Sequence, residues 1–416
     1  MFNPTRIASA CAAALLFTTL SASAATEQAK SSSAVLMQGY HWNSATGSWY
    51  NTVNSRVSDI KTLGVTHVWL PPASDAADAN GYLPRQLNKL DSRYGTAAQL
   101  KTLNTNLKNN GIHPVADIVV NHRVGTSNWA DFTNPTWGSW AVTRDDEWGQ
   151  GTGAWDTGTG YNAARDLDHT NATVRNDIKY FMNTTLKNAG FTGWRYDFSK
   201  GYSASYAKEY HDATNPSFCV GEIWTDLNYN DVNGHRQQLM NYVDGTAGAC
   251  AAFDFTTKGL LNRAISNNEY WRLRDSQGKP AGGIGWWAQK MVTFVDNHDT
   301  GPSGSCGSGQ NLWPVPCGGV VQSYAYILTH PGIPTVYWTH VYDWNLRNEI
   351  KAMIDIRKRQ GITSTSSVAI QVAENGRYAA IVNGKVAVKI GPNDWSPGAG
   401  WKLSAYGYQY AIWEKI

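Results

Sequence analysis

The sequence is poor in charge and has no long apolar run beyond its first residues. Charged side chains make up 16% of the 416 residues, and the formal net charge is only +3. No group of Lys and Arg is interleaved with aromatic residues, so nothing resembles the basic surface that binds a nucleic acid. A membrane-spanning helix would need about 20 apolar residues, and no later stretch supplies them. We therefore expect a protein that binds neither nucleic acid nor membrane and that acts on a neutral substrate.

Motifs of several enzyme classes are also missing. The sequence has no H-E-x-x-H, which excludes the common zinc-protease site, and no G-x-S-x-G nucleophile elbow. Gly151-x-Gly153 lacks the rest of a dinucleotide-binding fingerprint, and no D-x-D-x-D-G calcium loop is present. Neither NAD nor catalytic zinc is indicated.

Cysteine is scarce, and the number of cysteines that the mature protein keeps depends on whether its N-terminus is removed. Residues 1–24 place one Arg before a short apolar run and end in small residues, which is typical of a signal peptide. We expect secretion with cleavage near Ala24, which removes Cys11 and leaves an even set of four cysteines. These are Cys219, Cys250, Cys306 and Cys317. Three pairings are possible; a bond between the last two would close one Gly/Ser/Pro-rich loop, which favours a second bond between the first two.

Tryptophan and tyrosine, by contrast, are abundant. The chain has 19 Trp and 21 Tyr but only ten Phe. Flat rings with one polar edge suit stacking on the faces of sugar rings. For any single Trp, packing in the core is the commoner role.

Short apolar runs alternate along the chain with longer segments of helical period, which indicates βα units. Eight such runs favour a closed (β/α)8 TIM barrel of about 250 residues or more. The expected strands are 34–40, 65–71, 113–121, 192–198, 218–224, 249–255, 291–299 and 335–339. The clearest expected helices are 53–63, 97–109, 174–188, 206–213, 320–329 and 346–360.

Two segments break this rhythm. Residues 122–166 are too long for an ordinary βα loop and are interpreted as an inserted domain. Residues 362–416 show period-two alternation, which predicts a C-terminal antiparallel β-sheet domain. The catalytic barrel is then expected over 34–121 and 167–361.

Three carboxylates stand where expected barrel strands end, namely Asp197, Glu222 and Asp299. The C-terminal ends of barrel strands converge on the active site of this fold, so residues far apart in sequence can meet there. Glycoside hydrolysis with retention needs one carboxylate that attacks the anomeric carbon and one acid that protonates the leaving oxygen. Asp197 and Glu222 end neighbouring strands and are the natural pair. Arg195 shares a strand face with Asp197, and we expect it to keep Asp197 ionised.

The same residues resemble the α-amylase family, glycoside hydrolase family 13. Four short motifs carry this resemblance: DIVVNH at 117–122, GWRYDFSKG at 193–201, EIW at 222–224 and FVDNHD at 294–299. The surrounding sequence is most similar to cereal α-amylases, as in PSFCVGEIW, YAYILTHPG and YAIWEKI. The likeness runs from about residue 35 to residue 416.

The resemblance implies roles that spacing alone cannot assign. Asp197 would be the nucleophile, Glu222 the general acid/base and Asp299 the acid that stabilises the distorted sugar. Other residues would contact the substrate around the cleavage point. They are Tyr82, His122, Arg195, Lys200, Trp224 and His298. The tandem Trp286 and Trp287 match a surface starch site of the cereal enzymes, although packing of their loop explains two adjacent rings equally well.

Calcium is implied at the junction of barrel and inserted domain. Hard cations take several oxygen ligands from carboxylates, amides and carbonyls. By motif, the shared site corresponds to Asn121, Asp156, Asp166 and the carbonyl of Gly201. Asp146 could serve a second ion, although the neutral Gln150 stands where cereal enzymes have a further acidic ligand.

We therefore expect a monomeric, secreted, calcium-dependent α-amylase that hydrolyses internal α-1,4 bonds of starch and maltooligosaccharides. A maltooligosaccharide-forming enzyme or a 4-α-glucanotransferase on the same scaffold is an alternative, and Cys219 and Cys250 resemble the maltotetraose-forming group. A non-catalytic glucan-binding protein is a third reading, but binding alone does not need all three acids.

Overall fold

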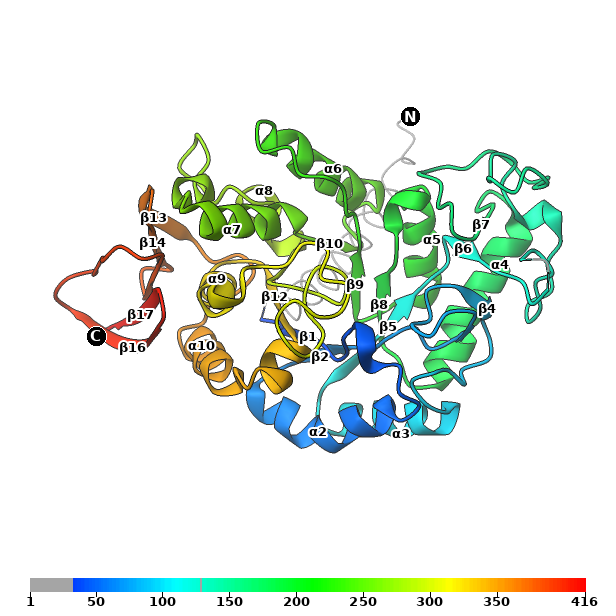
Figure 1. The fold of residues 1–416 in the computed structure, drawn as a ribbon, viewed down its shortest axis with the longest axis horizontal. Coiled ribbons are helices and arrows are strands. Elements are labelled where there is room, and N and C mark those ends of the chain that lie inside the picture. The colour runs from blue at the N-terminus through cyan, green and yellow to red at the C-terminus, as the bar shows by residue number, and fades with distance from the viewer. Residues whose placement is uncertain (1–32, 128) are drawn as a thin grey trace, which may run out of the picture.

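The computed structural model describes residues 33–127 and 129–416, and eight parallel strands close into a barrel at its centre (Figure 1). Their order around the barrel is β1-β12-β11-β10-β9-β8-β5-β2. The ring closes where β1 pairs with β12, which places Leu36 opposite Thr335. Apart from His113, every strand residue is buried, as expected for parallel strands covered by helices. In chain order, the strands are β1 (Leu36–Gln38), β2 (His67–Trp69), β5 (His113–Ile118), β8 (Gly193–Tyr196), β9 (Phe218–Gly221), β10 (Ala251–Phe253), β11 (Met291–Phe294) and β12 (Ile333–Tyr337). The predicted barrel is confirmed.

Helices surround the barrel, and their boundaries follow local capping and burial. Thr96 caps α3 by accepting the backbone N–H of Gln99, whose side chain bonds back to Thr96. Helices α2 to α5 are Trp49–Leu63, Ala97–Asn109, Ala172–Tyr180 and Ala204–Thr214. Helices α6 to α10 are Val232–Gly245, Phe255–Asn267, Ile284–Trp287, Val320–Thr329 and Arg347–Arg359.

Three of these helices, α6, α7 and α8, were not predicted. Helix α7 buries polar Thr256, Thr257 and Lys258 together with its apolar residues, so it shows no clean amphipathic period. Helix α4 is shorter than expected, because the chain continues from Tyr180 as a π-helix over Phe181–Leu186.

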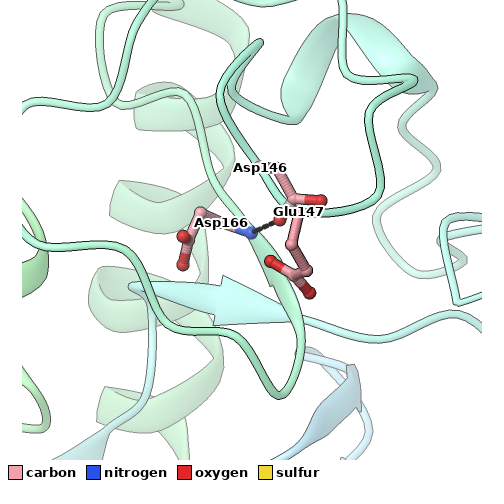
Figure 2. Close-up of side chains that lie close together, drawn as sticks. All are labelled: Asp146, Glu147 and Asp166. Atoms are coloured by element: carbon pink, nitrogen blue, oxygen red, sulfur yellow. Dashed lines mark hydrogen bonds between the residues drawn. The ribbon is translucent and has the colours of Figure 1, made fainter.

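Between β5 and α4 the chain makes the excursion that lies to the right in Figure 1. A two-residue ladder anchors it, in which β6 (His122–Arg123) pairs with β7 (Arg165–Asp166). Asp146, Glu147 and Asp166 lie close together beside this ladder (Figure 2). Asp146 accepts the backbone N–H of Asp166 at 2.9 Å, so it holds the β7 strand in place.

A five-stranded antiparallel sheet at the C-terminus lies to the left in Figure 1. This confirms the predicted sheet. Its order is β13-β14-β15-β17-β16, and Arg359 at the end of α10 ties it to the barrel through two bonds to Glu414, of 2.7 and 2.6 Å. The strands are Val368–Glu374, Arg377–Val382, Val386–Ile390, Trp401–Gly407 and Tyr410–Lys415.

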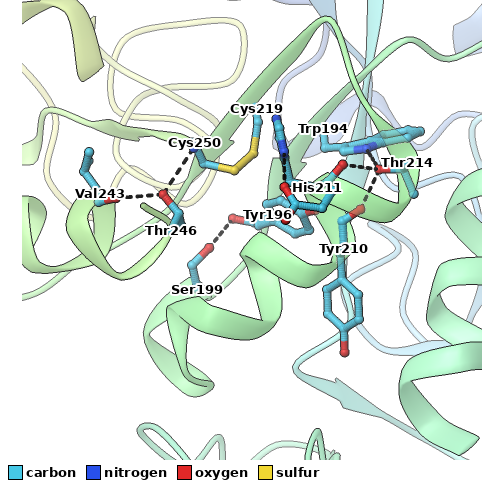
Figure 3. Close-up of a disulfide and its surroundings, with 11 residues drawn as sticks. Trp194, Tyr196, Ser199, Tyr210, His211, Thr214, Cys219, Val243, Thr246 and Cys250 are labelled. Atoms are coloured by element: carbon cyan, nitrogen blue, oxygen red, sulfur yellow. Dashed lines mark hydrogen bonds and ion pairs between the residues drawn. A yellow bond between two sulfur atoms is a disulfide. The ribbon is translucent and has the colours of Figure 1, made fainter. Parts of the chain in front are cut away.

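Two disulfides are formed. Their pairing is the one favoured because a bond between Cys306 and Cys317 closes a single loop. Cys219 in β9 bonds to Cys250, which directly precedes β10 (Figure 3). The Cys250 N–H donates to Thr246 Oγ1 at 3.2 Å, which fixes the end of α6 to the same point. Cys306 and Cys317 close an eleven-residue separation in the loop after β11. The first bond therefore links two neighbouring barrel strands, one of which leads to Glu222.

The expected signal peptide lies outside the described residues. Within residues 33–127 and 129–416, no helix has both the length and the apolar character needed to cross a membrane.

Replacing Cys219 and Cys250 by Ala should lower the free energy of unfolding by about 3–4 kcal/mol, because the bond restricts a 31-residue segment of the unfolded chain. The Cys306/Cys317 double Ala variant is the matched control and should lose less, since its loop is shorter. Chemical denaturation followed by circular dichroism measures both. An equal or smaller loss in the first variant would contradict this.

Candidate active site

One buried guanidinium lies at the centre of the site. Arg195 in β8 is fully buried, and its Nη1 lies 2.7 Å from Asp117 Oδ1 and 2.7 Å from Asp197 Oδ1. Its Nη2 lies 2.6 Å from Glu222 Oε1. A planar guanidinium presents donors in fixed directions, so these contacts bring together carboxylates from β5 and from the ends of β8 and β9. Two of the three predicted acids thus meet on one cation.

Asp117 is the member of this group that sequence reasoning missed. Its second oxygen accepts Tyr40 Oη at 3.0 Å, Tyr82 Oη at 2.9 Å and Trp69 Nε1 at 3.0 Å. The Trp69 ring also lies 4.8 Å from the guanidinium carbon of Arg195. Asp117 opens the DIVVNH motif, so a signal was present, but its role depends on contacts between distant strands.

The backbone turns sharply straight after Asp197. Phe198 has a φ of 42°, a left-handed conformation that costs energy for a residue with a side chain. In this conformation the Phe198 N–H donates to Glu222 Oε2 at 3.2 Å, and the Ser199 N–H donates to the Glu222 carbonyl at 3.0 Å. The turn therefore fixes Glu222 beside Asp197.

Asp299 enters the same pocket beside a neutral histidine. Gln38 donates to His298 Nδ1 at 2.8 Å, so the ring hydrogen is on Nε2, 3.3 Å from Asp299 Oδ2. Burial lowers the pKa of His298 well below its ordinary value, which keeps the ring uncharged. Gln310 Nε2 donates to Asp299 Oδ1 at 2.7 Å.

Burial dominates the protonation of the acids. It raises the pKa of Asp197 well above its ordinary value, and the nearby Glu222 and Asp117 charges add to this, in spite of the opposing Arg195. Arg195 does lower the pKa of Asp197, as expected, but burial is the larger effect. Burial, followed by the Glu222 charge, raises the pKa of Asp299 to about 8. One cation cannot balance four buried carboxyl groups, so the cluster holds protons near neutral pH.

Aromatic rings lie over the cluster of acids around Arg195. Tyr82 stacks on His298 at 5.1 Å between centroids, and Trp42 lies nearly parallel to Tyr82 at 6.3 Å. Tyr161 stacks on His122 at 4.1 Å, and His122 Nε2 donates to the Tyr82 carbonyl at 2.8 Å. The structure therefore brings together the predicted Tyr82, His122 and His298. Trp42 and Tyr161 were missed, since only the general excess of Trp and Tyr pointed to them.

A cleft of about 410 Å³ opens beside Glu222, lined also by Lys200, Trp224 and Asp226. Lys200 Nζ donates to the Trp224 carbonyl at 2.8 Å, so these two predicted residues do lie together. Trp286 and Trp287 are in α8 and do not line this cleft. Trp286 is 42% exposed, whereas Trp287 is half-buried, so they are not two equally exposed rings.

Four predicted metal ligands converge at the base of the excursion. A Cβ placed on Gly201 would lie 2.0 Å from Asn121 Oδ1, which shows how closely that oxygen faces the Gly201 backbone. Asp156 Oδ2 is buried and accepts no hydrogen bond. Asn121 Nδ2 contacts Asp166 Oδ1 at 3.1 Å, and burial raises the pKa of Asp166 to about 7. These oxygens fit a hard divalent cation, which would be the positively charged partner that Asp156 Oδ2 does not find within the protein.

The three acids in Figure 2 form a second group, which shares Asp166 with the first. Asp146 and Glu147 both contact Arg165 Nη1, at 2.9 and 2.8 Å. Arg165 therefore already supplies a positive charge where a second ion would bind. Glu147 was not predicted, because its neighbour Arg165 is 18 residues away.

Comparisons with known proteins agree with this geometry. Residues 41–244 match the family described as the α-amylase catalytic domain, and residues 359–414 match the α-amylase C-terminal β-sheet domain. Probable α-amylase 2 of Arabidopsis thaliana is 44% identical over 92% of this chain and 94% of its own length. The maltotetraohydrolase of Stutzerimonas stutzeri is 28% identical over 86% of this chain and 68% of its own length.

Solved structures share the fold at low identity. An α-amylase from Malbranchea cinnamomea superposes with a TM-score of 0.70 at 17% identity, over 93% of this chain and 97% of its own. The curated relatives are similar over nearly the whole length and include the segments that hold Arg195, Asp197 and Glu222. The chain therefore belongs to the α-amylase family of glycoside hydrolases.

Proposed function

We propose that the protein hydrolyses internal α-1,4-glucosidic bonds of starch and maltooligosaccharides with retention of anomeric configuration. The observation that carries this proposal is the joint contact of Asp197 and Glu222 with the single Arg195 guanidinium. Retaining enzymes need two carboxyl groups about 5 Å apart, and a shared guanidinium holds two carboxylates at such close range.

In the first step, an Asp197 oxygen attacks the anomeric carbon while a proton passes from Glu222 to the glycosidic oxygen. The bond between that carbon and oxygen breaks, and a new chain end leaves. In the second step, Glu222 takes a proton from water, whose oxygen attacks the same carbon and releases Asp197. Retaining glycosidases use the second carboxyl group in this way, first as acid and then as base.

The surrounding residues position the sugar at the cleavage point. Tyr82 offers a ring face, and the neutral His298 offers its ring N–H to sugar hydroxyls, whereas His122 donates its N–H to the Tyr82 carbonyl and so holds Tyr82 in place. Asp299 contacts hydroxyls of the distorted ring. Lys200 and Trp224 line the side toward the leaving chain. Trp286 and Trp287 are proposed as a separate surface site for starch.

Calcium is the proposed structural cofactor, held by Asn121, Asp156, Asp166 and the Gly201 carbonyl. Asp156 Oδ2 without a partner supports this set. Bound there, the ion would fix the excursion against the loop that follows Asp197. The proposed division is a barrel over 34–121 and 167–361, an inserted domain over 122–166 and a C-terminal domain over 362–416. A second ion at Asp146 would compete with Arg165.

The chain is further proposed to be secreted and monomeric. Transfer to another sugar hydroxyl instead of water would make it a glucanotransferase on the same residues. Product analysis on soluble starch separates the two, because hydrolysis creates a new reducing end at each cleavage and transfer does not.

Asp197→Asn and Glu222→Gln should each lower kcat on starch by about 10²–10⁴-fold or more, because each removes one of the paired carboxyl groups. An α-maltosyl fluoride distinguishes them, since fluoride leaves without a proton. Glu222→Gln should therefore still release fluoride in a first burst, whereas Asp197→Asn should not. The exposed Asp212→Asn is the isosteric control. Wild-type-like turnover in Asp197→Asn would refute the nucleophile assignment.

The raised pKa of Asp299 predicts a pH-dependent stability. With a native pKa of about 8 and an unfolded value of about 3.9, the native state binds the extra proton between these pH values. This group's contribution to the free energy of unfolding therefore falls as pH rises from 4 to 8. Asp299→Asn should gain stability over wild type toward pH 8 and lose that gain toward pH 4.

Denaturation at a series of pH values measures this difference. The exposed Asp244→Asn on α6 is the control and should follow the wild-type curve. A constant offset between Asp299→Asn and wild type at every pH would contradict the shifted pKa.

Removal of calcium with a chelator should lower the melting temperature and the activity together, and added Ca²⁺ should restore both. Asp156→Asn should need a higher Ca²⁺ concentration for the same recovery, because it replaces a charged ligand by a neutral one. Mg²⁺ at equal concentration is the control ion. A chelator-treated protein with unchanged melting temperature would argue against a structural ion.

A further inference from the structure

The loop of residues 302–317, here called the 302–317 loop, begins against the wall of the active site. Tyr337 Oη, at the end of β12, donates to the Pro302 carbonyl at 2.9 Å, which fixes the first residue of the loop. The Trp42 N–H then donates to Ser303 Oγ at 3.0 Å. Trp42 is one of the aromatic residues over the acids, so the outgoing part of the loop is tied to the site itself.

The returning part of the loop is fixed to the segment that carries Asp299. The Leu312 N–H donates to the Asp299 carbonyl at 3.0 Å, and the Val315 N–H donates to Asp296 Oδ1 at 3.2 Å. The same Asp296 oxygen accepts Lys258 Nζ at 2.6 Å, and both side chains of this ion pair are fully buried. Because separation of a buried ion pair leaves uncompensated charges, the return of the loop is held firmly.

Gln310 lies just before this return. The next residue, Asn311, has a φ of 51°, a left-handed conformation that Asn adopts more readily than most residues. The disulfide between Cys306 and Cys317 ties the outer part of the loop to the turn that leads into α9. The backbone that carries Gln310 is therefore held on both sides of it.

Both carboxyl oxygens of Asp299 have partners within the protein. Gln310 Nε2 donates to Oδ1 at 2.7 Å, and His298 Nε2 lies 3.3 Å from Oδ2. The Asp299 N–H donates to Asn297 Oδ1 at 3.1 Å. These contacts fix the plane of the carboxyl group, while the side chain stays 17% exposed and within reach of a ligand.

We propose that Gln310 is a positioning residue for the reaction: it fixes the direction in which the Asp299 carboxyl group meets the distorted sugar. The bond between Cys306 and Cys317 keeps the amide within reach. The inference rests on the proposed function, in which Asp299 contacts sugar hydroxyls. Such a fixed carboxyl group contributes most in the transition state, where the ring is most distorted.

Gln310→Ala should lower kcat on starch by about 10- to 100-fold with little change in KM, because a hydrogen bond that orients a carboxyl group is lost. The exposed Ser305→Ala on the same loop is the control; it keeps the carbonyl that accepts Ser308 Oγ at 2.6 Å and should behave as wild type. With Cys306 and Cys317 both replaced by Ala, Gln310→Ala should cost less than in wild type, since the loop no longer holds the amide in place.

Gln310→Glu keeps the shape of the side chain but replaces the amide donor by a titratable group. While protonated, the introduced carboxyl group donates to Asp299 as the amide does; once ionised, it repels that carboxylate. The ratio of kcat in this variant to wild-type kcat should therefore be near one at about pH 5 and fall toward about pH 9. Loss by one constant factor at every pH would mean that the loop only packs there, and would overturn the inference. Other groups that act on the Asp299 charge are the same in both proteins and cancel in the ratio; they are His298, Glu222, Arg195 and Asp117.

A measurement without substrate separates this inference from the proposed function. An N–H donor favours an ionised carboxyl group, so Gln310→Ala should raise the pKa of Asp299 above its value of about 8. The fall in the free energy of unfolding with rising pH should then extend to higher pH than in wild type. The Asp299→Asn background should abolish this difference.

If wild type creates no reducing ends from starch while this shift is present, the proposed function fails and the contact between Gln310 and Asp299 stands. If wild type hydrolyses starch, an unchanged kcat in Gln310→Ala overturns the positioning role. An unshifted stability curve in that variant overturns it as well.

Discussion

The site depends on burying one positive charge. Arg195 has no exposed surface, and the desolvation of its guanidinium is offset by contacts with Asp117, Asp197 and Glu222. Such an arrangement stabilises the fold only while all partners are present, because removal of one leaves an unbalanced charge in the interior. The residues that would perform the chemistry are therefore also residues that the core of the barrel requires. This explains why strained Phe198 is tolerated beside them.

Two levels of support surround that charge. The Tyr40, Tyr82 and Trp69 side chains fix Asp117 from inside the barrel, so its orientation does not depend on solvent. Gly201 stands four residues after Asp197 and faces Asn121, which joins the strand end to the base of the excursion. A displacement of the proposed metal ligands would thus shift Asp197 as well, because only a few backbone residues separate them.

Most of the architecture could be predicted from the sequence, because buried parallel strands leave apolar runs. Asp197 and Glu222 follow two of those runs directly, and Asp299 comes five residues after the end of β11. Asp197 and Glu222 were placed together by this reasoning, and Lys200 and Trp224 by family resemblance. What failed depended on packing between distant residues. The sequence of helix α7 shows no clear amphipathic period, because Lys258 is buried against Asp296, 38 positions away. The same limit applies to Glu147, to Trp42 and to the effect of burial on the pKa of Asp197, since burial has no local sequence signal.

The closure of the barrel sets the order in which the chain can fold. Leu36 in β1 pairs with Thr335 in β12, so the ring cannot close until almost all of the chain is available. Until then β1 has one edge without a partner, and such edges are prone to pair with other chains. The bond between Cys219 and Cys250 joins β9 to the start of β10 before β11 and β12 are needed. An oxidising environment would therefore shorten the search for the closed ring and reduce aggregation on the way to it.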